Sequence, residues 1–255
     1  MSLRILLMTM AHRKALHIFS TPPAFRNLFK FCKVQSLSMD KEAILKQTEE
    51  YIKNKLSGEG SGHDWWHVYR VWKNAIHIGE HEKVDLFVVQ LAALLHDISD
   101  WKFNDGNDDV GPRLAREWLQ KLQVEEKNIS HVCEIIKGMS FKGAGVRTQM
   151  HTTEGMVVQD ADRLDAIGAI GIARTFAYGG HMGREIYNPH IKPEVRDSFE
   201  KYKNSKGPTI NHFYEKLLLL RDLMNTETAK RIAGERHKFM EQFLTRFSNE
   251  WDGKD

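Results

Sequence analysis

Three short stretches of the sequence combine histidine with aspartate where such residues could do chemistry. The first is the pair His96-Asp97, which ends the most apolar segment of the chain, residues 84–97. A carboxylate beside an imidazole at the edge of a core is costly to bury unless both groups are paired or bind a metal ion. Metal ligation is therefore one interpretation of this pair. The other is a histidine that interacts with a helix dipole, next to a solvated aspartate.

The second stretch is Gly-His-Asp-Trp-Trp-His, which ends at His67. His67 lies one helical turn after Asp64, so this carboxylate can cap the helix and also orient the imidazole from the second shell of a metal site. His67 is the better ligand because a helix carries it. His63 precedes the helix and is the better candidate for substrate binding or support, with an ordinary polar loop histidine as the alternative. His77 and His81 also share a helix face, but this face is turned about 80° from His67, so we expect them at the surface.

The third stretch is Gln-Asp-Ala-Asp-Arg-Leu-Asp-Ala, which contains Asp160, Asp162 and Asp165. Carboxylates at positions i, i+2 and i+5 cannot share one helix face, so we expect one or two of them to point inward. The alternative is a solvated acidic face, and the apolar flanking residues argue against it. The small residues Gly168 and Gly171 follow, and they would let another helix approach closely.

Helices must position these stretches, because apolar residues recur at helical spacing almost throughout the chain from residue 40 onward. There is no internal repeat and no alternation of strands with helices, so the sequence predicts one all-α globular domain. A loop is expected over residues 178–208. The predicted helices cover residues 40–56, 84–97, 109–123, 127–138, 151–177, 209–224 and 226–248, and one further helix starts at residue 64.

The composition excludes several classes of protein. The 255 residues are 41% hydrophobic and 28% charged, which is ordinary for a globular protein. No apolar run reaches the roughly 18 residues that a membrane helix needs, so we expect no membrane partner. Cys32 and Cys133 cannot form a disulfide framework. The sequence has no GxxxxGK[ST], GxSxG, HExxH or paired CxxC motif, which argues against P-loop, α/β-hydrolase, zincin and zinc-ribbon proteins.

Basic charge is concentrated at the start of the chain. Residues 1–39 contain six of the 37 Lys and Arg residues and no Asp or Glu, so the net charge of +3 comes from this segment. A nucleic-acid footprint on the folded domain, predicted to span residues 40–255, is therefore not supported. The segment has the composition of an organelle transit peptide, which predicts a mitochondrial or chloroplast protein. The alternatives are a disordered basic extension, or translation from Met39, which would leave the protein cytoplasmic.

The order of the candidates, His67, then His96-Asp97, then Asp162, resembles the ligand pattern H…HD…D of the HD-domain metal-dependent phosphohydrolase superfamily. The strings GHDWWH, HDISDW and QDADRLDAIGAIGIAR are similar to those of one subfamily, the YpgQ-like nucleotide pyrophosphohydrolases. The resemblance covers about residues 40–225. It implies a helical bundle around one divalent metal ion that these four residues hold.

The chemistry of this ligand set agrees with a divalent ion. Two neutral imidazoles and two carboxylates have a net charge of −2 and leave two octahedral positions for water and a phosphate oxygen. Mn²⁺ fits best, and Fe²⁺, Co²⁺, Ni²⁺ or Zn²⁺ could also bind. Asp160 competes with Asp162 for the last ligand position. Asp100 is the candidate general base, although nucleotidases of the superfamily usually have Glu there, and the alternative is an ordinary carboxylate at a helix end.

Four cations, Lys102, Lys142, Arg147 and Arg174, are candidates for binding phosphate oxygens, with an ordinary surface role as the alternative for each. The resemblance implies a nucleotide phosphohydrolase that converts a (d)NTP to a (d)NMP and pyrophosphate by metal-activated water. The alternatives are a nucleoside monophosphate phosphatase, a cyclic-nucleotide phosphodiesterase, and a nucleotide-binding regulatory module with little turnover. The expected partner is a small nucleotide rather than nucleic acid, and a homodimer is an option that the sequence leaves open.

Overall fold

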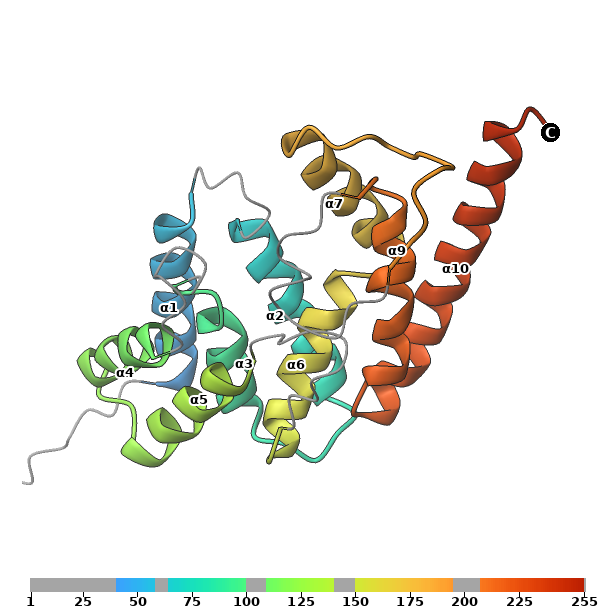
Figure 1. The fold of residues 1–255 in the computed structure, drawn as a ribbon. Coiled ribbons are helices and arrows are strands. Elements are labelled where there is room, and N and C mark those ends of the chain that lie inside the picture. Colours follow the sequence, from blue (N-terminus) through green and yellow to red (C-terminus); the bar gives the residue numbers. More distant parts are fainter. Residues whose placement is uncertain (1–39, 58–63, 100–108, 140–149, 195–206, 255) are drawn as a thin grey trace, which may run out of the picture. The chain divides into compact units, whose positions relative to one another are not determined.

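The structure, a computed structural model, describes residues 40–57, 64–99, 109–139, 150–194 and 207–254 (Figure 1). These residues form helices and connecting segments without any strand, which confirms the predicted all-α fold class. The helices are α1 (Lys41–Lys55), α2 (Trp65–Gly79), α3 (Leu86–Leu95), α4 (Val110–Lys121), α5 (Glu126–Gly138), α6 (Thr153–Asp165), α7 (Gly168–His181), α9 (Asn211–Glu215), the 3₁₀ helix η3 (Leu217–Leu223) and α10 (Glu227–Trp251).

Helix α3 is buried among the other helices because it is apolar on every side. All of its residues are buried except Leu86 and Gln90. It contacts α1, α2, α5 and α6, so little of its surface faces water. The predicted buried central helix is confirmed. The helix ends at Leu95, which places the His96-Asp97 pair at the point where the chain leaves the core.

Helix α2 packs against α3 and α6 through one apolar face. Val68, Val71 and Ala75 recur at helical spacing on this face and are fully buried. Asp64 begins the helix, because its carboxylate accepts a hydrogen bond of 2.9 Å from the backbone N–H of His67. The predicted helix start is confirmed, and it places His67 in the first turn.

The single helix predicted over residues 151–177 is wrong, since the chain turns between α6 and α7. Ile167 is extended and Gly168 has a φ of 75°, a left-handed conformation that favours glycine. A Cβ atom at Gly171 would lie 2.2 Å from the carbonyl oxygen of Ala166. These glycines therefore allow the turn itself, which helical periodicity alone does not reveal.

The C-terminal part of the chain differs from its prediction in three more places. Helix α7 continues to His181, so the predicted loop begins only after it. The helix predicted over residues 209–224 is divided into α9 and η3. Helix α10 runs to Trp251, slightly beyond its predicted end, and packs against α7. Within the described segments, no helix has the length and continuous apolar character that crossing a bilayer requires.

Candidate metal centre

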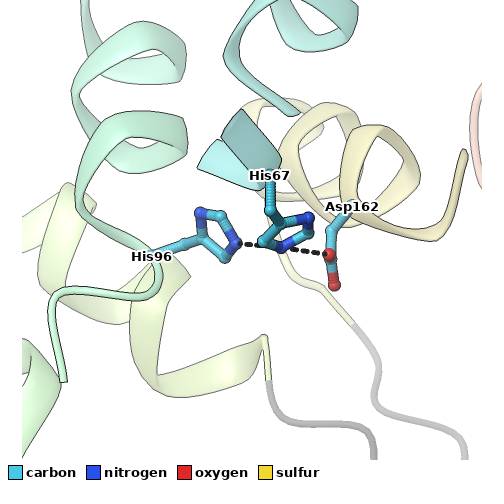
Figure 2. A group of neighbouring side chains, drawn as sticks. All are labelled: His67, His96 and Asp162. Carbon is cyan, nitrogen blue, oxygen red and sulfur yellow. Dashed lines mark hydrogen bonds and ion pairs between the residues drawn. The ribbon is translucent and has the colours of Figure 1, made fainter. Parts of the chain in front are cut away.

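Four of the predicted site residues meet where α2, the end of α3 and α6 come together. The Nε2 atom of His67 lies 3.4 Å from Nε2 of His96 and 3.5 Å from Oδ1 of Asp162 (Figure 2). The same atom lies 3.4 Å from Oδ2 of Asp97, which is in turn 3.5 Å from Nε2 of His96. These atoms of His67, His96 and Asp97 therefore lie 3.4–3.5 Å from one another, and Asp162 lies equally near the same atom of His67.

These spacings fit a shared metal ion. Donor atoms that lie about 2.1 Å from one ion are separated by about 3.0 Å in octahedral and about 3.4 Å in tetrahedral geometry. Candidate ligand atoms of His67, His96 and Asp162 all lie within 4.8 Å of one another. Imidazole and carboxylate donors together suit Mn, Fe, Co, Ni or Zn. The geometry is that of a centre for one divalent ion.

The two histidines are presented with their Nε2 atoms toward this centre. His96 caps α3, and its Nδ1 atom donates a hydrogen bond of 2.8 Å to the carbonyl oxygen of Ala93. Because a carbonyl can only accept, Nδ1 of His96 carries the proton and Nε2 is left as a metal ligand. The Nδ1 atom of His67 lies 2.7 Å from Oδ2 of Asp165. Both imidazoles are therefore anchored on the side away from the centre.

The carboxylates form the open side of the centre. The side chains of His67 and His96 are 2% and 3% exposed, whereas those of Asp97 and Asp162 are 17% and 37% exposed. Water or a ligand can therefore approach from the carboxylate side, while the histidine side is closed by the core. A catalytic metal site needs this kind of open position.

The three aspartates of α6 point to three different partners. Asp160 is fully buried, and its carboxylate accepts a hydrogen bond of 2.8 Å from the backbone N–H of Thr226, next to α10. Asp162 faces His67, and Asp165 is buried behind the same imidazole. Two of the three, Asp160 and Asp165, are buried, as expected, and they point in different directions because α2 and α10 both pack against α6.

Asp165 has the role that the sequence suggested for Asp64. Asp64 bonds to the backbone N–H of His67, whereas the imidazole Nδ1 atom bonds to Asp165. The orienting contact expected of Asp64 is therefore made by a residue 98 positions away from His67 in the sequence. The sequence did contain a local signal that Asp165 is buried, because it lies one helical turn after Asp162 between apolar residues. The partner of Asp165 could not be predicted, since it depends on how α6 packs on α2.

Charges inside the site favour a proton on His67 when no ion is bound. Burial lowers the pKa of His67, but hydrogen bonds to Asp165 and Asp97 outweigh this effect and raise the pKa to about 9. Burial likewise raises the pKa of Asp165, yet His67, Arg70 and Arg174 together hold it well below its usual range. A divalent ion would replace the proton on Nε2 and take over its contact with Asp97, whereas Asp165 would keep its bond to Nδ1.

The other predicted residues fall into two groups. Arg174 is described, and its Nη1 atom donates to Oδ2 of Asp165 at 2.6 Å, so it lies next to the site. His77 and His81 are exposed, as predicted, and the ring of His81 bonds to the backbone oxygen of His77. Five candidates lie outside the described residues: His63, Asp100, Lys102, Lys142 and Arg147.

Comparisons with known proteins agree with this geometry. A family model for the HD domain matches residues 65–167, the range that contains all four residues of the centre. YpgQ of Bacillus subtilis strain 168 is 41% identical over 215 residues, which is 83% of this chain and 97% of that protein.

Solved structures are similar along most of their length. An HD-superfamily hydrolase from Bacillus thuringiensis is 45% identical with a TM-score of 0.67, covering 84% of this chain and 99% of that one. The structure of B. subtilis YpgQ in complex with ADP is 35% identical in the superposition with a TM-score of 0.63, covering 83% of this chain and 100% of the other. The chain therefore belongs to the HD-domain superfamily of metal-dependent phosphohydrolases.

Proposed function

We propose that this protein is a nucleotide phosphohydrolase that cleaves a ribo- or deoxyribonucleoside triphosphate to the monophosphate and pyrophosphate. The observation that carries the proposal is the convergence of His67, His96, Asp97 and Asp162, closed on the histidine side and open on the carboxylate side. An ion held by two neutral imidazoles and two carboxylates keeps no excess positive charge. Because the protein would supply four ligands, two positions of an octahedral ion would stay exchangeable for water and a phosphate oxygen.

A bound divalent ion supplies a Lewis acid and lowers the pKa of water to a value near neutrality. The protein supplies the rest. The two imidazoles would hold the ion on the side of the core, and the partly exposed carboxylates would leave the approach open. We assign the general base to Asp100 and phosphate binding to His63, Lys102, Lys142 and Arg147. Arg174, the fifth candidate for phosphate binding, instead donates to Asp165 behind His67. Among the candidate metals, Mn²⁺ remains our choice for this mixed donor set.

The nucleotide part of the proposal is supported by the similar YpgQ chain that was solved with ADP. ADP contains a diphosphate, so its presence in a relative favours a polyphosphate substrate over a cyclic nucleotide or a monophosphate. A pyrophosphohydrolase attacks the α-phosphorus. The sequence has no P-loop for cradling the β- and γ-phosphates, which agrees with α attack rather than terminal transfer.

A panel of nucleoside mono-, di- and triphosphates and cyclic nucleotides, incubated with Mn²⁺, tests the proposal when phosphate and pyrophosphate are measured separately. We expect pyrophosphate from triphosphates, with ¹⁸O from labelled water in the monophosphate. Label in free orthophosphate would show attack at the γ-phosphorus and would contradict the proposed reaction. His96→Ala is the control, because it removes an ion ligand from the buried side of the centre and should abolish turnover.

A further inference from the structure

The imidazole of His67 is bonded from behind by one carboxylate, and two guanidinium groups bond to that carboxylate in turn. Oδ2 of Asp165 lies 2.7 Å from Nδ1 of His67. Arg70 donates from Nε to Oδ1 at 2.6 Å and from Nη2 to Oδ2 at 3.1 Å. Arg174 donates from Nη1 to Oδ2 at 2.6 Å. The Asp165 side chain is only 2% exposed, so water competes little with these bonds.

We propose that Asp165, clamped by Arg70 and Arg174, is a positioning residue that keeps a proton on Nδ1 of His67 and directs the Nε2 lone pair at the metal ion. The inference rests on the proposed metal-dependent function. An ionised carboxylate can only accept, so Nδ1 must donate and Nε2 is left for the ion. A carboxylate behind a ligating histidine fixes the ring and makes it a stronger donor to the metal.

The two arginines explain how a carboxylate can be kept at this buried position. An isolated buried carboxylate is strongly unfavourable, and one paired with well-placed donors is not. Arg70 occupies both oxygens of Asp165 with a forked contact, so the carboxylate cannot rotate about its last bond without losing one of them. Arg174 comes from α7, and Arg70 lies one turn after His67 on α2. Asp165 thus joins three helices at the back of one ligand.

The second imidazole of the centre is supported differently. Nδ1 of His96 donates to the neutral carbonyl oxygen of Ala93, within the same turn of chain. Only His67 depends on a charged acceptor that another helix brings to it. Changing Asp165 should therefore affect His67 and leave the orientation of His96 intact.

The test is Asp165→Asn. Asparagine offers one carbonyl oxygen to donors that now share two carboxylate oxygens, and its NH₂ group must face at least one N–H donor. We expect the affinity for Co²⁺, measured by absorption titration, to fall by about 10- to 100-fold. Asp160→Asn is the matched control, because it also alters a buried carboxylate of α6 but one that bonds to Thr226. It should lower the melting temperature and keep the Co²⁺ affinity of the unchanged protein.

A spectroscopic measurement separates positioning from a general loss of stability. Proton NMR of the Co²⁺-loaded protein detects the N–H protons of ligating imidazoles. In the unchanged protein the Nδ1–H of His67 should exchange slowly with solvent, because it is buried and bonded to Asp165. In Asp165→Asn this signal should exchange quickly or disappear, whereas that of His96 should remain. A residue that only stabilised the fold would change the melting temperature without this selective effect.

Two further variants keep the inference testable even if Asp165→Asn does not fold. Arg70→Gln removes the forked contact, and Arg70→Lys keeps the charge without the fork, so we expect reduced Co²⁺ affinity with the smaller loss in the lysine variant. Unchanged affinity and unchanged N–H exchange in the Asp165 and Arg70 variants would overturn the positioning role. Failure of the unchanged protein to bind Co²⁺ would instead overturn the metal centre and the proposed function.

Discussion

Replacing Asp160 or Asp162 by asparagine, one at a time, should separate the effect of a carboxylate on stability from its effect on metal affinity. The two residues are close neighbours on α6, yet Asp162 faces His67 whereas Asp160 holds the start of α10. The Asp160 carboxylate accepts hydrogen bonds from the backbone N–H groups of Asn225 and Thr226 at 2.8–3.0 Å. It also accepts from the Asn225 amide at 2.8 Å and the Thr226 hydroxyl at 2.9 Å.

The expected magnitude follows from these contacts. Asp160→Asn leaves one carbonyl oxygen for four donor groups and turns an NH₂ group toward at least one of them. A buried donor without an acceptor costs about 1–3 kcal/mol, so we expect the free energy of unfolding to fall by about this amount. For a domain of this size each kcal/mol lowers the melting temperature by about 2–4 °C. Asp162→Asn should destabilise the metal-free protein less, because this side chain is 37% exposed.

Two measurements on each variant check the reasoning. Urea unfolding in the presence of a chelator gives the stability of the metal-free protein, and Co²⁺ titration gives the affinity of the centre. We expect Asp160→Asn to lose stability and keep Co²⁺ affinity. We expect Asp162→Asn to keep most of its stability and lose Co²⁺ affinity. If Asp160→Asn lost Co²⁺ binding at unchanged stability while Asp162→Asn kept it, Asp160 would be the ligand and our assignment on α6 would be wrong.

Three other predictions concern pH, catalysis and targeting. The pKa of His67 is raised from 6.5 to about 9. The stabilisation that protonated His67 gives the metal-free protein is therefore complete below pH 6.5 and is lost as the pH rises through 9. Divalent ions must displace this proton, so Co²⁺ affinity should increase over the same interval, and a pH-independent affinity would contradict the assignment. Asp100→Asn should keep Co²⁺ affinity and lower kcat by about 10²- to 10⁴-fold, whereas a normal kcat with a changed KM would indicate substrate positioning. A reporter fused to residues 1–39 should enter mitochondria or plastids, and a cytosolic reporter would refute the transit peptide.

Helix content was predictable from the sequence because apolar periodicity reflects which face of each helix is buried. The residues of α3 are apolar on all sides, and the helix is buried as expected. The boundaries were less predictable where glycine conformation decides them. Residues 151–177 read as one helix, since nothing in their periodicity distinguishes a glycine within a helix from Gly168, which adopts a positive φ and ends the pattern.

The convergence of His67, His96 and Asp162 was also predictable, because a histidine or aspartate beside a strongly apolar segment is costly to bury unless it is paired or binds a metal ion. The residues behind them were not. Asp64 was the nearest carboxylate to His67 in the sequence, but its position at the N-cap directs it to a backbone N–H. The imidazole partner, Asp165, and its clamp of Arg70 and Arg174 come from three helices. Such contacts depend on tertiary packing, which local spacing does not encode.

The long sequence separation within the centre has a consequence for the kinetics of folding. His67 and Asp165 are 98 positions apart, so a large loop must close before α6 can lie against α2. Contacts of this kind are costly in chain entropy and tend to form late. A metal ion would then stabilise the native state more than the transition state that precedes it. We expect bound metal to slow unfolding with little effect on the folding rate. The ion would then stabilise the native state after it has formed, without taking part in the folding nucleus.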